Sequence, residues 1–370
     1  MRFAYFTHSL VSDWNHGNAH FLRGILRELA ARGHEATAWE PKDSWSRSHL
    51  RNESPRAEAD FRIRFPSLRS RLYGSVEDID AALCGMDVVI VHEWTDPKVV
   101  SHIGRRRRYS PFTLLFHDTH HRMVSAPDEM IRLDLSSFDG VLAFGAALRE
   151  AYLLQGWGRR VWTWHEAADT HLFHPMPEIE PDSEIVWIGN WGDGERTGEL
   201  DEFLFEPSAA TGQSPDVYGV RYPKEALKRL DRSGARYHGW LPNARVPEIF
   251  ARHRMTVHVP RRFYVDMLPG VPTIRVFEAL ACGIPLICAP WDDCESLFRP
   301  GRDFAMVRNR ADAERQMLLF RNEPAAARSY AARGLETIAK RHTVAHRVDE
   351  LVAILHELDV PSARRPEMSL

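Results

Sequence analysis

Short apolar segments alternate with amphipathic ones along most of the chain. In the first half, six such segments have the composition of buried strands: Phe3–Phe6, Glu35–Trp39, Asp87–His92, Phe112–Phe116, Gly140–Phe144 and Val161–Trp164. The clearest amphipathic segment between them, Ala19–Arg32, ends at Gly33, a residue typical of helix C-termini. Strand, helix and strand in succession predict a parallel sheet with helices on both faces.

The pattern restarts after an acidic, proline-containing stretch around Pro175–Pro181. New strands are expected at Glu184–Ile188, Asp216–Tyr218, Arg236–His238, Thr256–Val259, Pro285–Cys288 and Phe304–Val307. Helices are expected at Val246–Arg252, Ile274–Ala281, Ala311–Arg321 and Thr343–Leu358, with a frayed tail at Pro361–Pro366. The chain of 370 residues therefore suits two Rossmann-like α/β domains. We place them at 1–172 and 173–345, with residues 346–370 as a helix packing back toward the first domain, followed by the tail.

The charge balance argues against nucleic acid as a partner. The formal net charge is −3, and acidic and basic residues interleave, so no domain-wide positive field is expected. The exception is the arginine run Arg105–Arg108, followed by Tyr109. It is expected to be a solvated surface turn. Docking onto an anionic membrane is the alternative.

The four cysteines indicate a reducing compartment. Cys84, Cys282, Cys288 and Cys294 have neither the spacing of a disulfide framework nor that of a zinc site. The first residues turn polar too soon for a signal peptide, and no apolar stretch is long enough to span a membrane. We therefore expect a cytoplasmic protein, with association to a membrane surface as an option.

Four stretches resemble the group 1 (family 4) glycosyltransferases. His16-Gly17-Asn18 and Gly33-His34-Glu35 flank the first helix as in that family's glycine-rich opening, and Ala168–Pro175 is similar to its interdomain segment. Phe277–Pro285 resembles its donor-site helix, and the ending from Gly301 to Arg347 looks most like the CgeB-type branch. The resemblance implies a GT-B fold, in which two Rossmann-like domains face each other across a cleft, and a nucleotide-diphosphate sugar as donor.

The loop before the Ile274–Ala281 helix has the features of a diphosphate cradle. Helix N-termini favour phosphate, Gly270 permits a close backbone approach, and Thr273 can cap the helix. Arg275 lies on the first turn and is expected to reach phosphate. The resemblance implies that Glu278 accepts hydrogen bonds from the ribose hydroxyls. The family's other glutamate, eight positions earlier, is replaced here by Gly270.

Two further loops are expected to complete the nucleotide site. Arg261 and Arg262 follow a strand, and at least one of them is expected to bind phosphate. The loop after Glu184–Ile188 contributes Gly189, Asn190, Trp191 and Arg196, where the family carries two cations. Asn190 replaces the first cation and Arg196 falls near the second. Leu241 is expected to contact the base through its backbone. The glycine spacing does not match a dinucleotide fingerprint, so no NAD is expected.

In the first half, His117 and Asp118 end a strand, where open α/β sheets carry their chemistry. The resemblance implies that His117 lies against the donor sugar, reaching it from the first domain, and we assign both residues to catalysis. His120 and His121 follow, and a metal site is the alternative interpretation. Their spacing matches no metal motif, so we expect neither a metal nor another cofactor.

The acceptor is assigned to two loops of the first half. His92 and Glu93 end a central strand, and the glycine-rich loop after the first strand contributes Asp13, His16, Gly17 and Asn18. Inverting relatives carry a histidine base just after the loop glycine. Asn18 stands there in this sequence and cannot take a proton, so a retaining mechanism is favoured.

The sequence thus predicts a metal-independent glycosyltransferase of the hexosyl type. A sugar-nucleotide epimerase on the same fold and a degenerate sugar-nucleotide-binding protein are the alternatives. The acceptor (saccharide, lipid-linked, small-molecule or protein), the base and the sugar of the donor, and the oligomeric state stay open.

Overall fold

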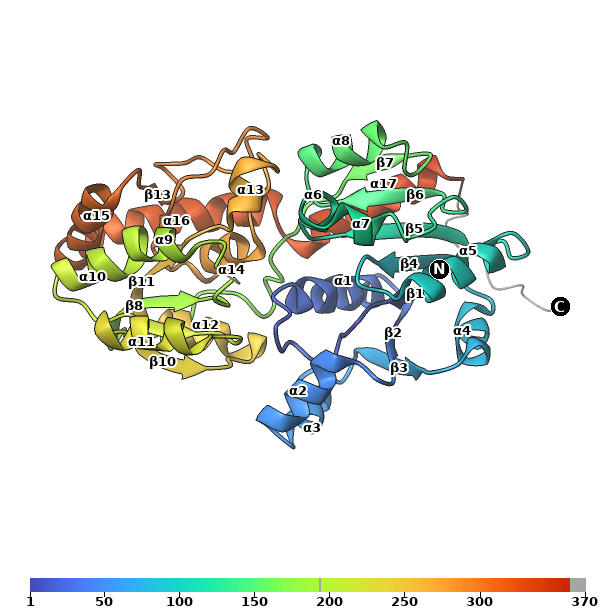
Figure 1. Cartoon of the computed structure of the whole chain (residues 1–370), viewed down its shortest axis with the longest axis horizontal. Coiled ribbons are helices and arrows are strands. Elements are labelled where there is room, and N and C mark those ends of the chain that lie inside the picture. Colours follow the sequence, from blue (N-terminus) through green and yellow to red (C-terminus); the bar gives the residue numbers. More distant parts are fainter. Residues whose placement is uncertain (193, 360–370) are drawn as a thin grey trace. The chain divides into compact units, whose positions relative to one another are not determined.

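The structure, a computed structural model, describes residues 1–192 and 194–359. The chain forms two compact units (Figure 1). The first unit comprises Met1–Ser12, Leu22–His165 and the described residues from Ala345 onward. The second comprises Asp13–Phe21 and Glu166–Val344. The expected tail at Pro361–Pro366 lies outside the described residues.

The first unit is built on a seven-stranded parallel sheet in the order β3-β2-β1-β4-β5-β6-β7. Its strands are β1 (Arg2–Phe6), β2 (Glu35–Pro41), β3 (Arg69–Tyr73), β4 (Val88–His92), β5 (Thr113–Asp118), β6 (Gly140–Ala143) and β7 (Val161–Thr163). Every residue of β4, β5 and β6 is buried, because helices cover both faces of a parallel sheet.

Nine helices belong wholly or largely to the described part of this unit. They are α1 (Ala19–Ala31), α2 (Trp45–Glu53), α3 (Ala57–Arg64), α4 (Val76–Leu83), α5 (Pro97–Arg107), α6 (Arg122–Ser125), α7 (Pro127–Met130), α8 (Ala146–Leu154) and α17 (Val344–Glu357). The C-terminal helix α17 is fixed by side chains of this unit. The indole N–H of Trp164 donates to the carbonyl of Arg347 (2.8 Å), and that of Trp162 donates to Glu357 (2.9 Å).

The second unit has a six-stranded parallel sheet in the order β10-β9-β8-β11-β12-β13. The strands are β8 (Ser183–Ile188), β9 (Asp216–Tyr218), β10 (Arg236–Gly239), β11 (His253–His258), β12 (Leu286–Cys288) and β13 (Ala305–Met306). The helices are α9 (Thr197–Leu200), α10 (Glu206–Ala210), α11 (Lys224–Arg232), α12 (Val246–Ala251), α13 (Arg262–Asp266), α14 (Ile274–Cys282), α15 (Arg310–Asn322) and α16 (Pro324–Arg341). A π-helical turn at Asp201–Phe205 joins α9 to α10, and a 3-10 turn at Asn243–Arg245 precedes α12.

The predicted α/β class with two parallel sheets is confirmed. All twelve expected strands are present, with ends shifted by a few residues. The strand β3 was not predicted because Arg69 and Arg71 expose their side chains on the edge of the sheet. The glycine-rich loop differs from expectation in its location, since Asp13–Phe21 clusters with the second unit.

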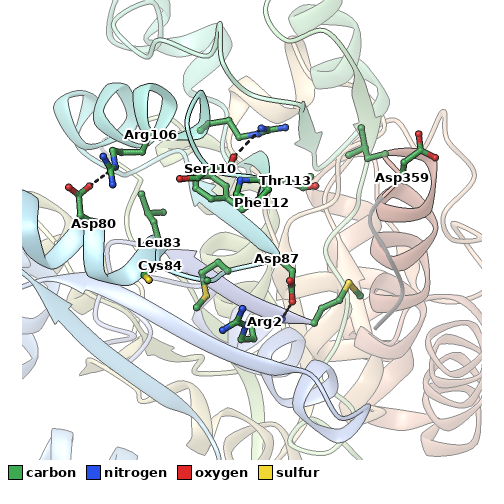
Figure 2. A pocket seen from close by; sticks show the side chains of 16 residues that line it. Arg2, Asp80, Leu83, Cys84, Asp87, Arg106, Ser110, Phe112, Thr113 and Asp359 are labelled. Carbon is green, nitrogen blue, oxygen red and sulfur yellow. Dashed lines mark hydrogen bonds and ion pairs between the residues drawn. The ribbon is translucent and has the colours of Figure 1, made fainter. Parts of the chain in front are cut away.

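The arginine run ends α5, at the amino-terminal edge of the first sheet. A cavity of about 580 Å³ lies beside it, at the starts of β1, β4 and β5 (Figure 2). Arg106 pairs with Asp80 (3.0 Å), and Arg107 donates two hydrogen bonds to Asp139 (both 3.0 Å). Half of the run is therefore held against carboxylates of its own unit.

A buried carboxylate ties three elements of the second unit together and makes its stability depend on pH. Asp216 accepts hydrogen bonds from Arg236 (2.6 and 2.9 Å), His253 (3.0 Å) and His238. Burial acts to raise the pKa of Asp216, but these hydrogen bonds outweigh it and hold the pKa well below its ordinary value. A depressed carboxyl pKa contributes stability above the unfolded-state pKa, and that stability is lost as pH falls.

Asp216→Asn is therefore expected to lower the melting temperature by about 5 °C at pH 7, the scale of one charge-assisted hydrogen bond. The difference in melting temperature between the variant and the wild type should stay constant down to roughly pH 5 and become smaller below about pH 4. Thermal unfolding across that range measures it. A difference that stays constant to pH 3 would show that the carboxylate charge contributes nothing.

Candidate active site

Two loops at the carboxyl-terminal edge of the second sheet bring cationic side chains together. The strands β8 and β11 are neighbours, and their loops carry Arg196 and Arg261. The Arg196 guanidinium donates to the carbonyls of Val259 (2.8 Å) and Asn190, and it lies over the Trp187 ring at 5.1 Å. These contacts fix a buried guanidinium at the edge where open α/β sheets bind ligands.

The positive charge at this edge is only partly neutralised, since Arg261 pairs with Glu195 (3.5 Å) and Arg275 pairs with Glu278. Burial, followed by the nearby charge of Arg261, lowers the pKa of Arg196 to about 10, and Arg275 adds to the effect. Burial, with Arg196 and Arg275, lowers the pKa of His258 to about 3. Within the described residues, no carboxylate lies within ion-pair distance of Arg196, and its buried Nε has no hydrogen-bond partner. Three guanidiniums that repel one another favour an anion between them.

Glycines let the loop after β8 pass close to these arginines. Gly192 has a φ of 84°, and a Cβ there would lie 3.2 Å from Nε of Arg196 and 3.6 Å from Nε of Arg261. A side chain at position 192 would therefore both strain the backbone and crowd the guanidiniums. Asn190 holds the loop in place, because its Oδ1 accepts from the backbone N–H of Val220 (2.9 Å).

The first turn of α14 is left without a side-chain cap. Thr273 occupies the N-cap position, but its hydroxyl bonds to Nε2 of His258 (2.9 Å) rather than to the helix backbone. The expected capping role of Thr273 is thus wrong, because the buried imidazole competes for the hydroxyl. The positive N-terminal end of the α14 dipole lies on the same turn as Arg275, and both favour an anion.

Glu278 is buried and already engaged by the chain itself. Its side chain is 0% exposed, with Oε1 2.7 Å from Nδ1 of His20 and Oε2 paired with Arg275. Glu166 lies near, since burial and the charge of Glu278 raise its pKa. Sequence reasoning selected Glu278 and Arg275 but did not connect them with His20 or Glu166. The apolar neighbours of Glu278 in α14 signalled its burial, but no sequence signal identified its partners.

We expect Glu278→Ala to weaken nucleotide binding by about 2 kcal/mol, because Arg275 and His20 both lose the group that orients them. Glu278→Gln keeps the shape and hydrogen-bonding atoms and should lose less. Calorimetry with UDP on both variants measures the two effects. Equal affinity of the alanine variant and the wild type would exclude Glu278 from the nucleotide site.

Several other predicted donor residues serve the fold of the second unit. A Cβ at Gly270 would lie 2.9 Å from both Cys294 and Glu295. Gly270 therefore allows these two side chains to pack closely against the backbone. Trp191 is 4% exposed and belongs to the hydrophobic core. Arg262 is exposed and forms two hydrogen bonds with Glu199. Of the two adjacent arginines, Arg261 is therefore the one at the cationic site. Leu241 is half-buried in the loop after β10.

The glycine-rich loop packs on α14 within the second unit. A Cβ at Gly17 would lie 3.4 Å from Ile274, and Asn15 accepts a hydrogen bond from Asn190 (2.5 Å). Asp13 accepts from the backbone N–H of Asn243 (3.1 Å). His16 is buried and Asn18 half-buried in the same loop. These contacts hold the loop against the rest of the second unit.

In the first unit, His92 and His117 stand side by side in register at the ends of β4 and β5. Nδ1 of His117 shares a hydrogen bond with the Tyr5 hydroxyl, and the His117 ring lies edge-on to Trp164 (4.8 Å between ring centroids). Burial lowers the pKa of His117 to about 3. The imidazole is therefore neutral at physiological pH and can polarise or orient a hydroxyl without carrying charge.

A coupled pair of carboxyl groups lies beside these histidines. Asp118 accepts from the Tyr152 hydroxyl (2.7 Å) and the His120 backbone (3.0 Å), yet burial raises its pKa to about 6. Burial, together with the charge of Asp118, also raises the pKa of Glu93, against the attraction of Arg122. Arg122 donates to Oε2 of Glu93 (3.0 Å). One cation next to two buried carboxyls favours a shared proton, an arrangement suited to general acid–base work.

No group of three or more His, Cys, Asp or Glu side chains is arranged to hold a metal ion among the described residues. None of the helices in the described part of the chain is long and apolar enough to cross a membrane.

Comparisons with known proteins identify the class of fold. A family model described as "Glycosyl transferase-like" matches residues 196–353. No curated protein matches the sequence. The two-domain α/β architecture is that of the GT-B class, and the structure is similar over nearly its whole length to solved glucosyltransferases.

One of these is an alpha-glucosyltransferase in complex with UDP, with a TM-score of 0.70, 10% identity, and coverage of 96% of this chain and 100% of that chain. A second is Anabaena Alr3699/HepE in complex with UDP-glucose, with a TM-score of 0.67, 11% identity, and coverage of 96% and 100%. A third is the DNA-modifying enzyme beta-glucosyltransferase, with a TM-score of 0.65, 14% identity, and coverage of 97% and 100%.

Proposed function

We propose that the protein is a glycosyltransferase that takes a hexose from a uridine-diphosphate sugar. The observation that carries the proposal is the group of Arg196, Arg261 and Arg275 beside the glycine loop and the uncapped end of α14. A buried guanidinium such as that of Arg196, which has no carboxylate at ion-pair distance among the described residues, suits a diphosphate leaving group when it lies near two further arginines and a helix N-terminus. The fold and the glycosyl transferase-like match of residues 196–353 support the same activity. UDP is proposed because similar structures were solved with UDP or UDP-glucose.

The same proposal assigns the sugar chemistry to the first unit. The neutral imidazole of His117 acts on the transferred sugar, and the Glu93–Asp118 pair manages the proton of the acceptor hydroxyl. Retention is proposed from Asn18, which cannot serve as a base, and the C-terminal stretch favours the CgeB-type branch. Nuclear magnetic resonance of the first-formed product would give its anomeric configuration, and an inverted product would exclude retention.

Incubation with UDP-glucose, UDP-galactose and UDP-N-acetylglucosamine tests the activity. We expect slow release of UDP with at least one donor and faster release when an acceptor is present. A GDP-sugar and an ADP-sugar serve as matched controls that test whether the enzyme requires uracil as the nucleobase of the donor. Conversion of the sugar without UDP release would indicate an epimerase. UDP binding without turnover of any donor would indicate a binding protein.

Turnover is expected to need no divalent metal, because arginines and a helix N-terminus can offset the diphosphate charge. The rate of UDP release should change by less than about twofold in excess EDTA, on the scale of experimental scatter in such rates. Loss of activity in EDTA that manganese or magnesium restores would overturn this part of the proposal.

A further inference from the structure

Four aromatic residues follow four adjacent strands at the carboxyl-terminal edge of the first sheet. In the order of the sheet, Trp45 follows β2, His8 follows β1, Trp94 follows β4 and His120 follows β5. We call these four residues the aromatic row. Neighbouring rings are in contact, with centroids 6.4 Å apart for Trp45 and His8, 6.4 Å for His8 and Trp94, and 5.4 Å for Trp94 and His120. The row therefore crosses the edge of the sheet as a continuous set of rings.

The two tryptophans of the row are exposed and yet held in place. Trp45 is 46% exposed and Trp94 is 42% exposed. Trp45 stacks nearly parallel to His8 (interplanar angle 7°), and it contacts His49 edge-on (6.1 Å between ring centroids). The Arg122 guanidinium lies over the Trp94 ring at 4.2 Å. Large aromatic surfaces that are fixed and left in water are typical of binding surfaces.

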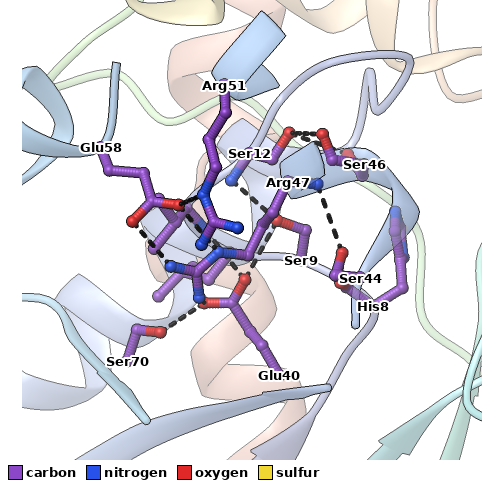
Figure 3. A network of polar contacts seen from close by, with 12 residues as sticks. His8, Ser9, Ser12, Glu40, Ser44, Ser46, Arg47, Arg51, Glu58 and Ser70 are labelled. Atoms are coloured by element: carbon purple, nitrogen blue, oxygen red, sulfur yellow. Dashed lines mark hydrogen bonds and ion pairs between the residues drawn. The ribbon is translucent and has the colours of Figure 1, made fainter. Parts of the chain in front are cut away.

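A polar network fixes the loop and helix that carry the first half of the row (Figure 3). Ser44 caps α2, and its hydroxyl donates to the carbonyl of His8 (2.8 Å). Ser12 donates to the carbonyl of Ser46 (2.9 Å), which joins the segment after β1 to the start of α2. Arg47 pairs with Glu58 (2.9 Å). The network thus positions Trp45 relative to His8 before any ligand binds.

The charges beside the row are already paired. Arg47 contacts Glu58, and Arg122 contacts Glu93 and Glu129. Oε1 of Glu93 is buried and has no hydrogen-bond partner among the described residues. A polyanion or an anionic lipid surface needs cations that it can neutralise. A neutral ligand with hydroxyl groups fits better, because its flat face can stack on the rings and it needs no unpaired cation.

We propose that the aromatic row binds the acceptor and that the acceptor is a carbohydrate chain of more than one ring. Four adjacent strands at a spacing of about 4.8 Å make the row roughly 14 Å long, which exceeds a single sugar ring. The buried Glu93–Asp118 pair lies under the row at the ends of β4 and β5, where it can accept the proton of an acceptor hydroxyl as the bond to the donor sugar carbon forms and UDP departs. This inference rests on the proposed glycosyltransferase function.

Binding to a printed glycan array, in the presence of UDP, tests the inference. The wild type is expected to bind one or more oligosaccharides of related structure. Trp45→Ala and Trp94→Ala should each weaken that binding by about tenfold or more, the scale of one lost stacking contact. Trp157→Ala is the matched control, because Trp157 is a half-buried tryptophan in the loop before β7, at the opposite edge of the same sheet. It should bind like the wild type.

UDP affinity, measured by calorimetry for each variant, separates this inference from the proposed function. All variants should bind UDP like the wild type, which also shows that they are folded. A wild type that binds UDP but no glycan would overturn the carbohydrate acceptor, as would glycan binding that survives both substitutions. Binding of a short DNA duplex that depends on Trp45 and Trp94 would assign the row to nucleic acid instead. A wild type that binds no UDP would refute the proposed function itself.

Discussion

Replacing Arg196 with methionine is expected to weaken UDP binding by about 100-fold. This is the scale of one strong charge-assisted contact made in a buried site. The guanidinium is buried, its charge has no carboxylate at ion-pair distance among the described residues, and its pKa is lowered to about 10 by burial and by Arg261. In the wild type, the buried charge of Arg196 is already in place to attract the diphosphate, and binding of the diphosphate relieves the repulsion between the arginines. The methionine variant lacks this attraction. Calorimetric titration with UDP measures the loss.

Two controls make the result specific. Arg262→Met removes a neighbouring arginine that is exposed and paired with Glu199, so it should leave the UDP affinity nearly unchanged. UMP carries one phosphate fewer and should lose less affinity than UDP in the Arg196 variant. Arg196 also donates to two backbone carbonyls, so melting temperatures must show that the variant is folded. A folded Arg196 variant with wild-type UDP affinity would remove Arg196 from the diphosphate site.

The sequence predicted those parts of the fold in which the pattern of apolar residues matches the burial of the element. Segments such as Val88–Val91 are apolar throughout, which is the composition of a strand buried on both faces of a parallel sheet. The edge strand β3 and the helix α3 were missed because their side chains are mostly exposed and charged. Trp45 lies on the unpredicted helix α2, so the aromatic row could not be assembled from the sequence.

For the candidate site, the sequence likewise predicted some features and not others. Arg196, Arg261 and Arg275 could be selected because each follows a predicted strand or begins a predicted helix. Whether a selected residue is free or already engaged is a property of tertiary contacts. Glu278 meets His20, and Thr273 meets His258, through packing that no local pattern records. Resemblance supplied roles for residues, whereas the structure supplied their partners.

The two units carry different ionisable groups at their candidate sites, and the proposed reaction assigns a different task to each unit. In the second unit, Arg196 has no carboxylate at ion-pair distance among the described residues, and we propose that its charge stabilises the diphosphate of the bound donor and of the product. In the first unit, burial raises the pKa of Glu93 and Asp118 and lowers the pKa of His117. Residues of the first kind should govern affinity, and residues of the second kind should govern rate.

His117→Ala is accordingly expected to reduce turnover by roughly 100-fold or more, the scale of one positioned polar group in a transition state. The affinity for UDP should barely change, because UDP lacks the sugar on which His117 is proposed to act. Since burial holds the pKa of His117 near 3, its imidazole is neutral above about pH 4, and the pH dependence of turnover should not report its ionisation.

Steady-state rates and UDP calorimetry on the same preparation measure the two effects. His117→Gln keeps a polar group of similar reach and should therefore recover part of the turnover that His117→Ala loses. If the loss came only from a structural defect, the glutamine variant would not recover turnover. Tyr5→Phe removes the hydroxyl that bonds to Nδ1 and should cause a smaller loss than His117→Ala, because the ring stays in place beside Trp164. If a folded His117→Ala variant keeps near-normal turnover, or loses UDP affinity instead, His117 is a structural strand-end residue and the sugar chemistry must be assigned elsewhere.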